Sequence, residues 1–105
     1  MERVSPQELQ SLIAASDPPR LIDVREPWEF EVCRIDGSVN IPMAVLQERL
    51  DTIPRGAPVV VICHHGARSL QVAQYLESLG YDPIANLEGG IDGWACAIDP
   101  DMQRY

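Results

Sequence analysis

The sequence contains no apolar run of the roughly 20 residues that a membrane-spanning helix requires. Its first five residues are mostly polar and lack the apolar segment of a signal peptide, so we expect a cytoplasmic protein. Positive charge is also scarce, because 16 acidic residues outnumber 8 basic ones and give a net charge of −8. This excess of negative charge argues against nucleic acid, and against an anionic membrane surface, as a partner.

No repeat, low-complexity segment or linker divides the sequence, and we expect a single domain over residues 1–105. A C-x-x-C motif is absent as well. The three cysteines, Cys33, Cys63 and Cys96, cannot all pair, and free thiols are the expected state in a reducing cytoplasm.

Strand-like and helix-like segments alternate along the chain. The expected strands are short apolar runs at 21–24, 39–41, 59–62 and 83–86. The expected helices are a capped helix from Ser5 to about Ala15, a helical turn at 25–31, a helix opened by Pro42, a helix at 69–79 followed by Gly80, and a segment around Trp94. This alternation predicts an α/β domain with a mostly parallel sheet, in which ligands bind at the carboxyl ends of strands.

The loop Cys63-His64-His65-Gly66-Ala67-Arg68 follows the expected strand at 59–62 and precedes the expected helix at 69–79. A cysteine in this place sits on a turn whose backbone N–H groups can all point at its sulfur. The helix adds the positive end of its dipole, and Arg68 adds a full charge. Each of these favours the thiolate, which is the nucleophile. We therefore predict that Cys63 is reactive, and the polar residues after it argue against its burial.

Four segments, spread over most of the chain, occur in the order that is typical of one family. They are Leu21-Ile22-Asp23-Val24-Arg25-Glu26, Ile35-Asp36-Gly37-Ser38-Val39-Asn40-Ile41-Pro42, Cys63-x4-Arg68-Ser69 and Gly89-Gly90-Ile91-Asp92-Gly93-Trp94. Together they resemble a single-domain rhodanese, a sulfurtransferase homology domain. A lone C-x4-R motif is weak evidence, whereas four ordered motifs are specific. The resemblance implies a three-layer sandwich, in which helices cover both faces of a mostly parallel central sheet.

The resemblance also implies a chemistry. The loop cysteine of that family attacks the sulfane sulfur of a donor, such as thiosulfate or a persulfide, and passes that sulfur to cyanide, a thiol or a protein. Carried over to this chain, Cys63 is the catalytic nucleophile of a thiosulfate:acceptor sulfurtransferase. The substrate-binding residues are those of the surrounding cradle: His64, His65, Gly66, Ala67, Arg68 and Ser69. Arg68 closes the loop or neutralises the anion, and neither a metal nor an organic cofactor is implied.

His64 and His65 replace the basic residues that usually follow the cysteine in this family, so attraction for a thiosulfate dianion should be weaker. A metal site with Cys63 is not expected, because adjacent residues of one tight loop seldom supply convergent ligands and no second Cys/His cluster exists. A Cys–His catalytic pair is less needed where loop amides already favour the thiolate. We interpret both histidines as residues that recognise the donor. The family's Gly-His before Ile35 is also replaced, by Cys33 and Arg34, a change that says little about catalysis.

Other polar and aromatic residues have less specific interpretations. Asp23 and Arg25 flank a strand end. We expect them to join neighbouring loops by hydrogen bonds, and we favour this role over acid–base catalysis. Trp94 is expected to pack in the core, against the sheet or the loop. A resolving role for Cys33 or Cys96 at Cys63 has no support from their spacing.

Three functions compete. A sulfurtransferase acting through a Cys63 persulfide is favoured. A non-enzymatic persulfide carrier, or a module for protein binding or sensing, is the alternative, and retention of Cys63 favours chemistry over binding alone. A phosphatase or arsenate reductase is less favoured, because such enzymes place five residues between cysteine and arginine, whereas this loop has four. The expected partners are a small sulfur-containing anion and a thiol or protein acceptor. We expect a monomer, although no feature of the sequence fixes the oligomeric state.

Overall fold

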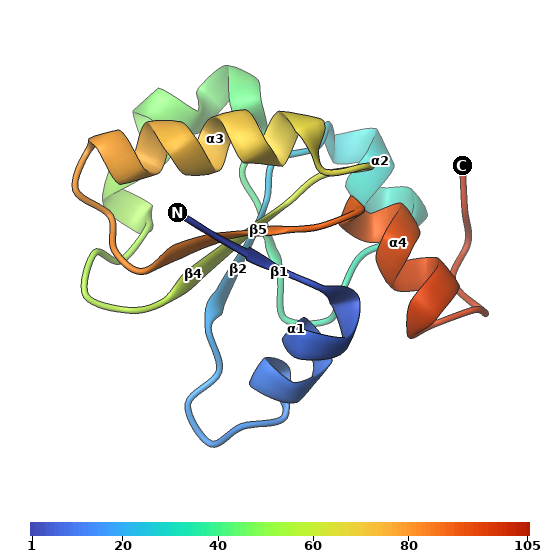
Figure 1. The fold of residues 1–105 in the computed structure, drawn as a ribbon. Coiled ribbons are helices and arrows are strands. Elements are labelled where there is room, and N and C mark those ends of the chain that lie inside the picture. The colour runs from blue at the N-terminus through green and yellow to red at the C-terminus, as the bar shows by residue number, and fades with distance from the viewer.

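The computed structural model describes all residues, 1–105, as alternating strands and helices (Figure 1). The elements in chain order are β1 (Glu2–Val4), α1 (Pro6–Ile13), β2 (Arg20–Asp23), α2 (Pro27–Val32), β3 (Val39–Asn40), the 3₁₀ helix η1 (Met43–Thr52), β4 (Val59–Ile62), α3 (Ala67–Ser78), β5 (Ile84–Leu87) and α4 (Gly90–Ala97). No helix is long and apolar enough to cross a membrane.

The five strands form one sheet in the order β1-β5-β4-β2-β3, and every neighbouring pair is parallel. The central strand β4 is buried along its whole length, which explains its unbroken run of branched apolar residues. Leu21, Val60 and Ala85 are in register across the three inner strands and belong to one core cluster. Their immediate neighbours in the strands, Ile22 and Val61, belong to the other. Alternate side chains therefore build a core on each face of the sheet.

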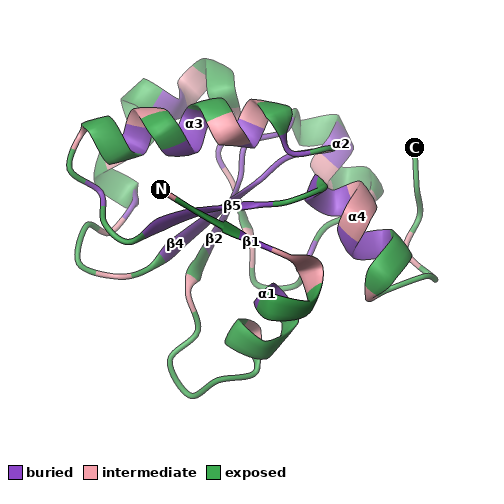
Figure 2. Ribbon diagram, viewed as in Figure 1, coloured by how far each residue is buried: buried purple, intermediate pink, exposed green.

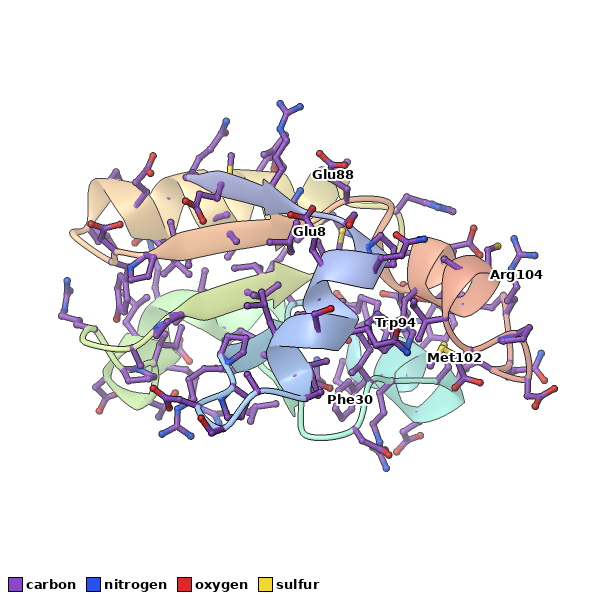
Figure 3. All side chains as sticks on the ribbon, turned by 60° about the horizontal axis from the view of Figure 1, so that its bottom comes forward. Glu8, Phe30, Glu88, Trp94, Met102 and Arg104 are labelled. Carbon is purple, nitrogen blue, oxygen red and sulfur yellow. The ribbon has the colours of Figure 1, made fainter.

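Helices cover both faces and leave the sheet as the buried middle layer (Figure 2). On one face α3 and η1 contribute residues such as Leu76 and Leu46 to the core. On the other face α1 and α4 contribute Leu9, Ile91 and Trp94, and Met102 packs against this cluster (Figure 3). The predicted α/β sandwich with helices on both faces and the predicted burial of Trp94 are confirmed.

Three local expectations are corrected by the structure. The segment after Pro42 is a 3₁₀ helix, in which Leu46 is the buried residue. Helix α3 begins at Ala67, two residues earlier than expected, because Gly66 takes the left-handed N-cap conformation with φ of +106°. The edge strand β1 was not expected, because its three residues are too few to show a periodic pattern. The capping box at Ser5 and the left-handed Gly80 after α3 are confirmed.

The start of α4 fixes the loop that follows β4. The amide of Ile91 donates to the carbonyl of Cys63 (2.8 Å), and the amide of Asp92 donates to that of His64 (3.0 Å). Gly90 permits this approach, because a Cβ at this position would overlap the carbonyl oxygen of Cys63 and lie 2.5 Å from that of His64. Its φ of +60° lies in the left-handed region. The two hydrogen bonds and the close approach of Gly90 hold the loop against the start of α4, and we call this contact the clamp.

Replacing Gly90 with alanine is expected to lower the free energy of unfolding by about 3 kcal/mol, from left-handed strain together with overpacking against the loop. Urea denaturation measures the change. Gly56→Ala is the matched control, because Gly56 has no positive φ and nothing within 4 Å of an added Cβ, and it should stay within about 0.5 kcal/mol of wild type. Equal stabilities for the two variants would contradict the clamp.

Candidate active site

Cys63 is the first residue after β4, at the carboxyl edge of the sheet, where the sequence predicts a site. Its side chain is buried, with an exposed fraction of 1%, so the expectation that polar neighbours keep it exposed is wrong. The reason is that Cys63 continues the core alternation of β4 and packs with the cluster under α3. The loop folds over the sulfur rather than presenting it on the surface.

The sulfur lies at the beginning of α3. The amide of Gly66 donates a hydrogen bond to Sγ of Cys63 (3.1 Å), and it is the one loop amide that does so, where the sequence predicts several. Gly66 is the N-cap of α3, a helix of 12 residues whose positive dipole end faces the loop. Its φ of +106° favours glycine, because residues with a side chain rarely adopt this backbone conformation.

Beneath the loop lies a buried polar pair, Ser69 and Asn86. The hydroxyl of Ser69 donates to Oδ1 of Asn86, and the amide of Asn86 donates to the carbonyl of Gly66 (3.2 Å). Ser69 is fully buried, so its side chain supports the loop and does not face a substrate. Sequence reasoning missed Asn86, although a polar residue within the apolar strand β5 is a detectable signal.

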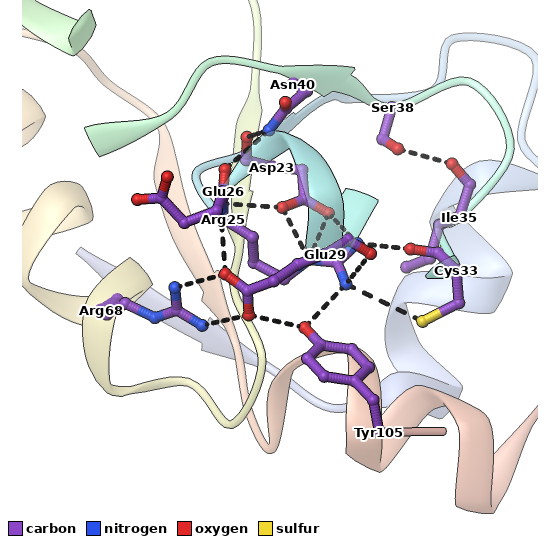
Figure 4. A network of polar contacts seen from close by, with 10 residues as sticks. All are labelled: Asp23, Arg25, Glu26, Glu29, Cys33, Ile35, Ser38, Asn40, Arg68 and Tyr105. Atoms are coloured by element: carbon purple, nitrogen blue, oxygen red, sulfur yellow. Dashed lines mark hydrogen bonds and ion pairs between the residues drawn. The ribbon is translucent and has the colours of Figure 1, made fainter. Parts of the chain in front are cut away.

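Arg68 projects from the first turn of α3 and forms a bidentate ion pair with Glu29 of α2, with both N–O distances at 2.8 Å (Figure 4). The guanidinium therefore holds the loop against α2, and its charge is already matched by a carboxylate. Sequence reasoning missed Glu29. The available signal was the Glu26-Pro27-x-Glu29 pattern of a helix start, in which Glu29 accepts the amide of Glu26 (2.9 Å).

The Glu29 carboxylate is buried and remains charged because its oxygens are fully hydrogen-bonded. The bonds from Arg68 outweigh burial and, with those from the Glu26 amide and the Tyr105 hydroxyl (2.8 Å), lower the pKa of Glu29 to about 2. In return, burial and the bond to Glu29 raise the pKa of Tyr105 to about 12. Tyr105 therefore remains a neutral donor at physiological pH.

Asp23 and Arg25 form a fully buried ion pair behind Glu29. The Arg25 guanidinium also donates to the carbonyls of Glu29 (3.1 Å) and Cys33 (2.6 Å) and to the hydroxyl of Tyr105 (3.0 Å). Burial opposes its charge, but the bonds to Asp23 and Tyr105 outweigh burial and raise the pKa of Arg25. The pair joins β2, α2 and the C-terminal segment, which confirms the predicted bonding of neighbouring loops.

The two loop histidines belong to a stack of rings. His64 lies between His65 and Tyr105, with ring centroids 3.9 and 4.0 Å apart. Its Nε2 is buried without a hydrogen-bond partner. Burial, together with the neighbouring His65, lowers the pKa of His64, so its ring is neutral at pH 7. His65 is exposed.

The other two cysteines do not share the core cluster of Cys63, although the sulfur of Cys33 lies 3.8 Å from Nη1 of Arg25 (Figure 4). Cys33 packs against the core cluster on the α4 face of the sheet, whereas Cys63 belongs to the cluster on the α3 face. Cys96 is exposed on α4. No group of three or more His, Cys, Asp or Glu side chains is arranged to hold a metal ion.

The Glu29 carboxylate makes the stability of the fold depend on pH in a defined direction. Because folding lowers the pKa of Glu29 from 4.5 to about 2, its contribution is present above the unfolded value and is lost as the pH falls towards 2. We expect the difference in unfolding free energy between wild type and Glu29→Gln to be largest above about pH 5 and to shrink below it. Urea denaturation over this range measures it.

The control for this comparison is Glu31→Gln, because Glu31 is exposed on the same helix and makes no side-chain hydrogen bond. A difference between wild type and Glu29→Gln that stayed constant between pH 7 and 3 would show that the ion pair with Arg68 does not stabilise the protein.

Comparison with known proteins places this site in a family. The model of the rhodanese-like domain matches residues 5–97. A sulfurtransferase of Allochromatium vinosum is 34% identical over 95 residues, which cover 90% of this chain and 89% of the relative. The probable adenylyltransferase/sulfurtransferase MoeZ of Mycobacterium tuberculosis is 33% identical over 97% of this chain but 26% of its own length.

This chain thus spans about a quarter of the length of several curated relatives. Among solved structures, a rhodanese-like domain protein from Staphylococcus aureus superposes with a TM-score of 0.85 at 31% identity, over 90% of this chain and 91% of the other. A protein from Staphylococcus saprophyticus gives a TM-score of 0.84 at 35% identity, over 90% and 93%. With the fold, the ordered motifs and these matches in agreement, the chain belongs to the rhodanese-like domain family.

Proposed function

We propose that the protein is a sulfurtransferase in which Cys63 carries sulfane sulfur as a persulfide. The observation that carries the proposal is the place of the Cys63 sulfur, at the end of β4, before the N-terminus of α3 and within hydrogen-bond distance of the Gly66 amide. Sulfur transfer is also named for relatives that match nearly all of this chain, such as the sulfurtransferase of Allochromatium vinosum.

The proposed reaction has two steps. In the first, the Cys63 thiolate attacks the outer sulfur of thiosulfate, an S–S bond forms at Cys63, and the bond to the leaving sulfite breaks. In the second, an acceptor such as cyanide or a thiolate attacks the outer sulfur of the persulfide, and the Cys63 thiolate leaves. The atoms and electrons balance without an oxidant or a reductant.

The loop supplies what this chemistry requires. The persulfide places a new negative charge one bond beyond Sγ, and the free amides at the start of α3, with its dipole, stabilise charge there. The amides of His64 to Ser69 are the proposed cradle. Arg68 is a positioning residue in this scheme, because its ion pair with Glu29 holds the end of the loop. The clamp from α4 keeps the geometry fixed before the substrate arrives.

Incubation with thiosulfate is expected to add the mass of one sulfur atom to wild type and none to Cys63→Ser, and cyanide should remove the added mass. Intact-protein mass spectrometry measures both. Cys33→Ser and Cys96→Ser are the matched controls and should load like wild type, since neither residue lies in the loop. Loading of Cys63→Ser would refute the proposal.

The same experiment separates the alternative functions. A stable persulfide that turns over slowly with cyanide and small thiols would identify a carrier that serves a dedicated partner. Absence of loading from thiosulfate and from polysulfide would leave a binding or sensing module. Hydrolysis of an aryl phosphate that is lost in Cys63→Ser would revive the phosphatase interpretation, which the four-residue spacing disfavours.

A further inference from the structure

A row of aromatic rings extends from helix α2 to the loop that follows Cys63. Trp28 of α2 meets Tyr105 edge-on, with ring centroids 5.6 Å apart. The stack continues through His64, which directly follows Cys63 in the chain, to His65. Trp28 is 59% exposed and Tyr105 is 37% exposed. Aromatic side chains are enriched at protein interfaces, and the two adjacent rings offer an apolar contact on the surface.

Carboxylates outnumber cations around this row. Three guanidinium groups lie near this row, those of Arg25, Arg68 and Arg104, and each is paired with a carboxylate. Glu26, which directly precedes α2 and lies two positions before Trp28, is exposed and has no cationic partner. The whole sequence contains no lysine that could add a free positive charge here.

The chemistry of this surface selects against small anions and for cations. Aromatic rings bind guanidinium and ammonium groups through their negative faces, and neighbouring carboxylates strengthen that attraction. A dianion such as thiosulfate finds only ion-paired guanidinium groups near this row. A positively charged protein surface would gain both from the aromatic row and from the net negative charge of the chain.

We propose that the surface formed by Glu26, Trp28 and Tyr105 docks a protein acceptor whose reactive cysteine is flanked by arginine or lysine. This inference rests on the proposed function and names the acceptor class for it. The acceptor thiolate attacks the outer sulfur of the Cys63 persulfide, the acceptor becomes the persulfide, and the Cys63 thiolate is released. Trp28 is the central contact, since it is the most exposed large apolar side chain of the protein.

The test uses protein whose Cys63 has been loaded with sulfur from polysulfide and checked by mass. Two synthetic peptides of equal length act as acceptors, each with one cysteine, flanked by arginines in one and by glutamates in the other. The neutral thiol 2-mercaptoethanol is the reference acceptor. The second-order rate constant of sulfur loss from Cys63 is measured for each acceptor at low and high salt.

We expect the arginine peptide to react at least about tenfold faster than the glutamate peptide at about 20 mM salt, and the ratio to fall several-fold at about 0.5 M salt. Trp28→Ala and Glu26→Gln should each reduce the rate with the arginine peptide by about fivefold, because one contact to a cation is lost. Their rates with 2-mercaptoethanol should stay within about twofold of wild type.

Two control variants match these changes elsewhere on the surface. Leu12→Ala removes an exposed apolar side chain from α1, and Glu48→Gln removes an exposed charge from η1, so both should keep the wild-type ratio of the two peptide rates. Because arginines also make a peptide thiol more reactive in itself, the decisive result is the change of that ratio between wild type and Trp28→Ala.

Equal rates for the two peptides, or a preference that survives in Trp28→Ala, would overturn the docking surface and leave the sulfurtransferase proposal intact. Failure of Cys63 to load, or of the loaded protein to react with 2-mercaptoethanol, would overturn the sulfurtransferase proposal and the docking proposal with it.

Discussion

Both oxygens of the Glu29 carboxylate accept hydrogen bonds, and the side-chain donors come from positions 39 and 76 residues further along the chain. Arg68 reaches it from α3 and Tyr105 from the C-terminal segment, while Arg25 donates to its backbone carbonyl. A buried carboxylate without hydrogen-bond partners strongly destabilises a protein. The need to satisfy the Glu29 carboxylate therefore holds each of its donors in place. The Glu29 carboxylate thereby holds the loop after Cys63, helix α2 and the last residues of the chain in contact with one another.

This arrangement assigns the placement of the loop and the stabilisation of an anion to different groups. The charge of Arg68 is matched by Glu29, so in the proposed reaction Arg68 places the loop and backbone dipoles stabilise the anion. Dipoles fixed by the fold need no rearrangement when charge develops, which suits the proposed persulfide, whose negative charge lies one atom beyond Sγ of Cys63. The burial of Cys63 acts in the same direction, because low polarity around the sulfur strengthens its hydrogen bond with the Gly66 amide.

Features that have a local sequence pattern could be predicted from the sequence. Contacts between residues far apart in the chain could not. The run at 59–62, the Ser5 capping box and the cysteine loop all have signatures within a few residues. Glu29 and Arg68 are 39 positions apart, and Glu29 and Tyr105 are 76 apart, so no periodicity connects them. The burial of Cys63 was misjudged because its polar neighbours point elsewhere while its own side chain continues the alternation of β4.

The contact between Gly90 and the carbonyls of residues 63 and 64 also limits how the loop can be rebuilt. No space is left on the α4 side, since even a single methyl group at Gly90 overlaps the loop backbone. An inserted residue would have to bulge outward, away from α4 and towards α2, where it would meet the Arg68–Glu29 pair. Enlarging the cradle for a tetrahedral oxyanion would therefore require the start of α4 to retreat as well. The length of the loop and the position of α4 can therefore change only together.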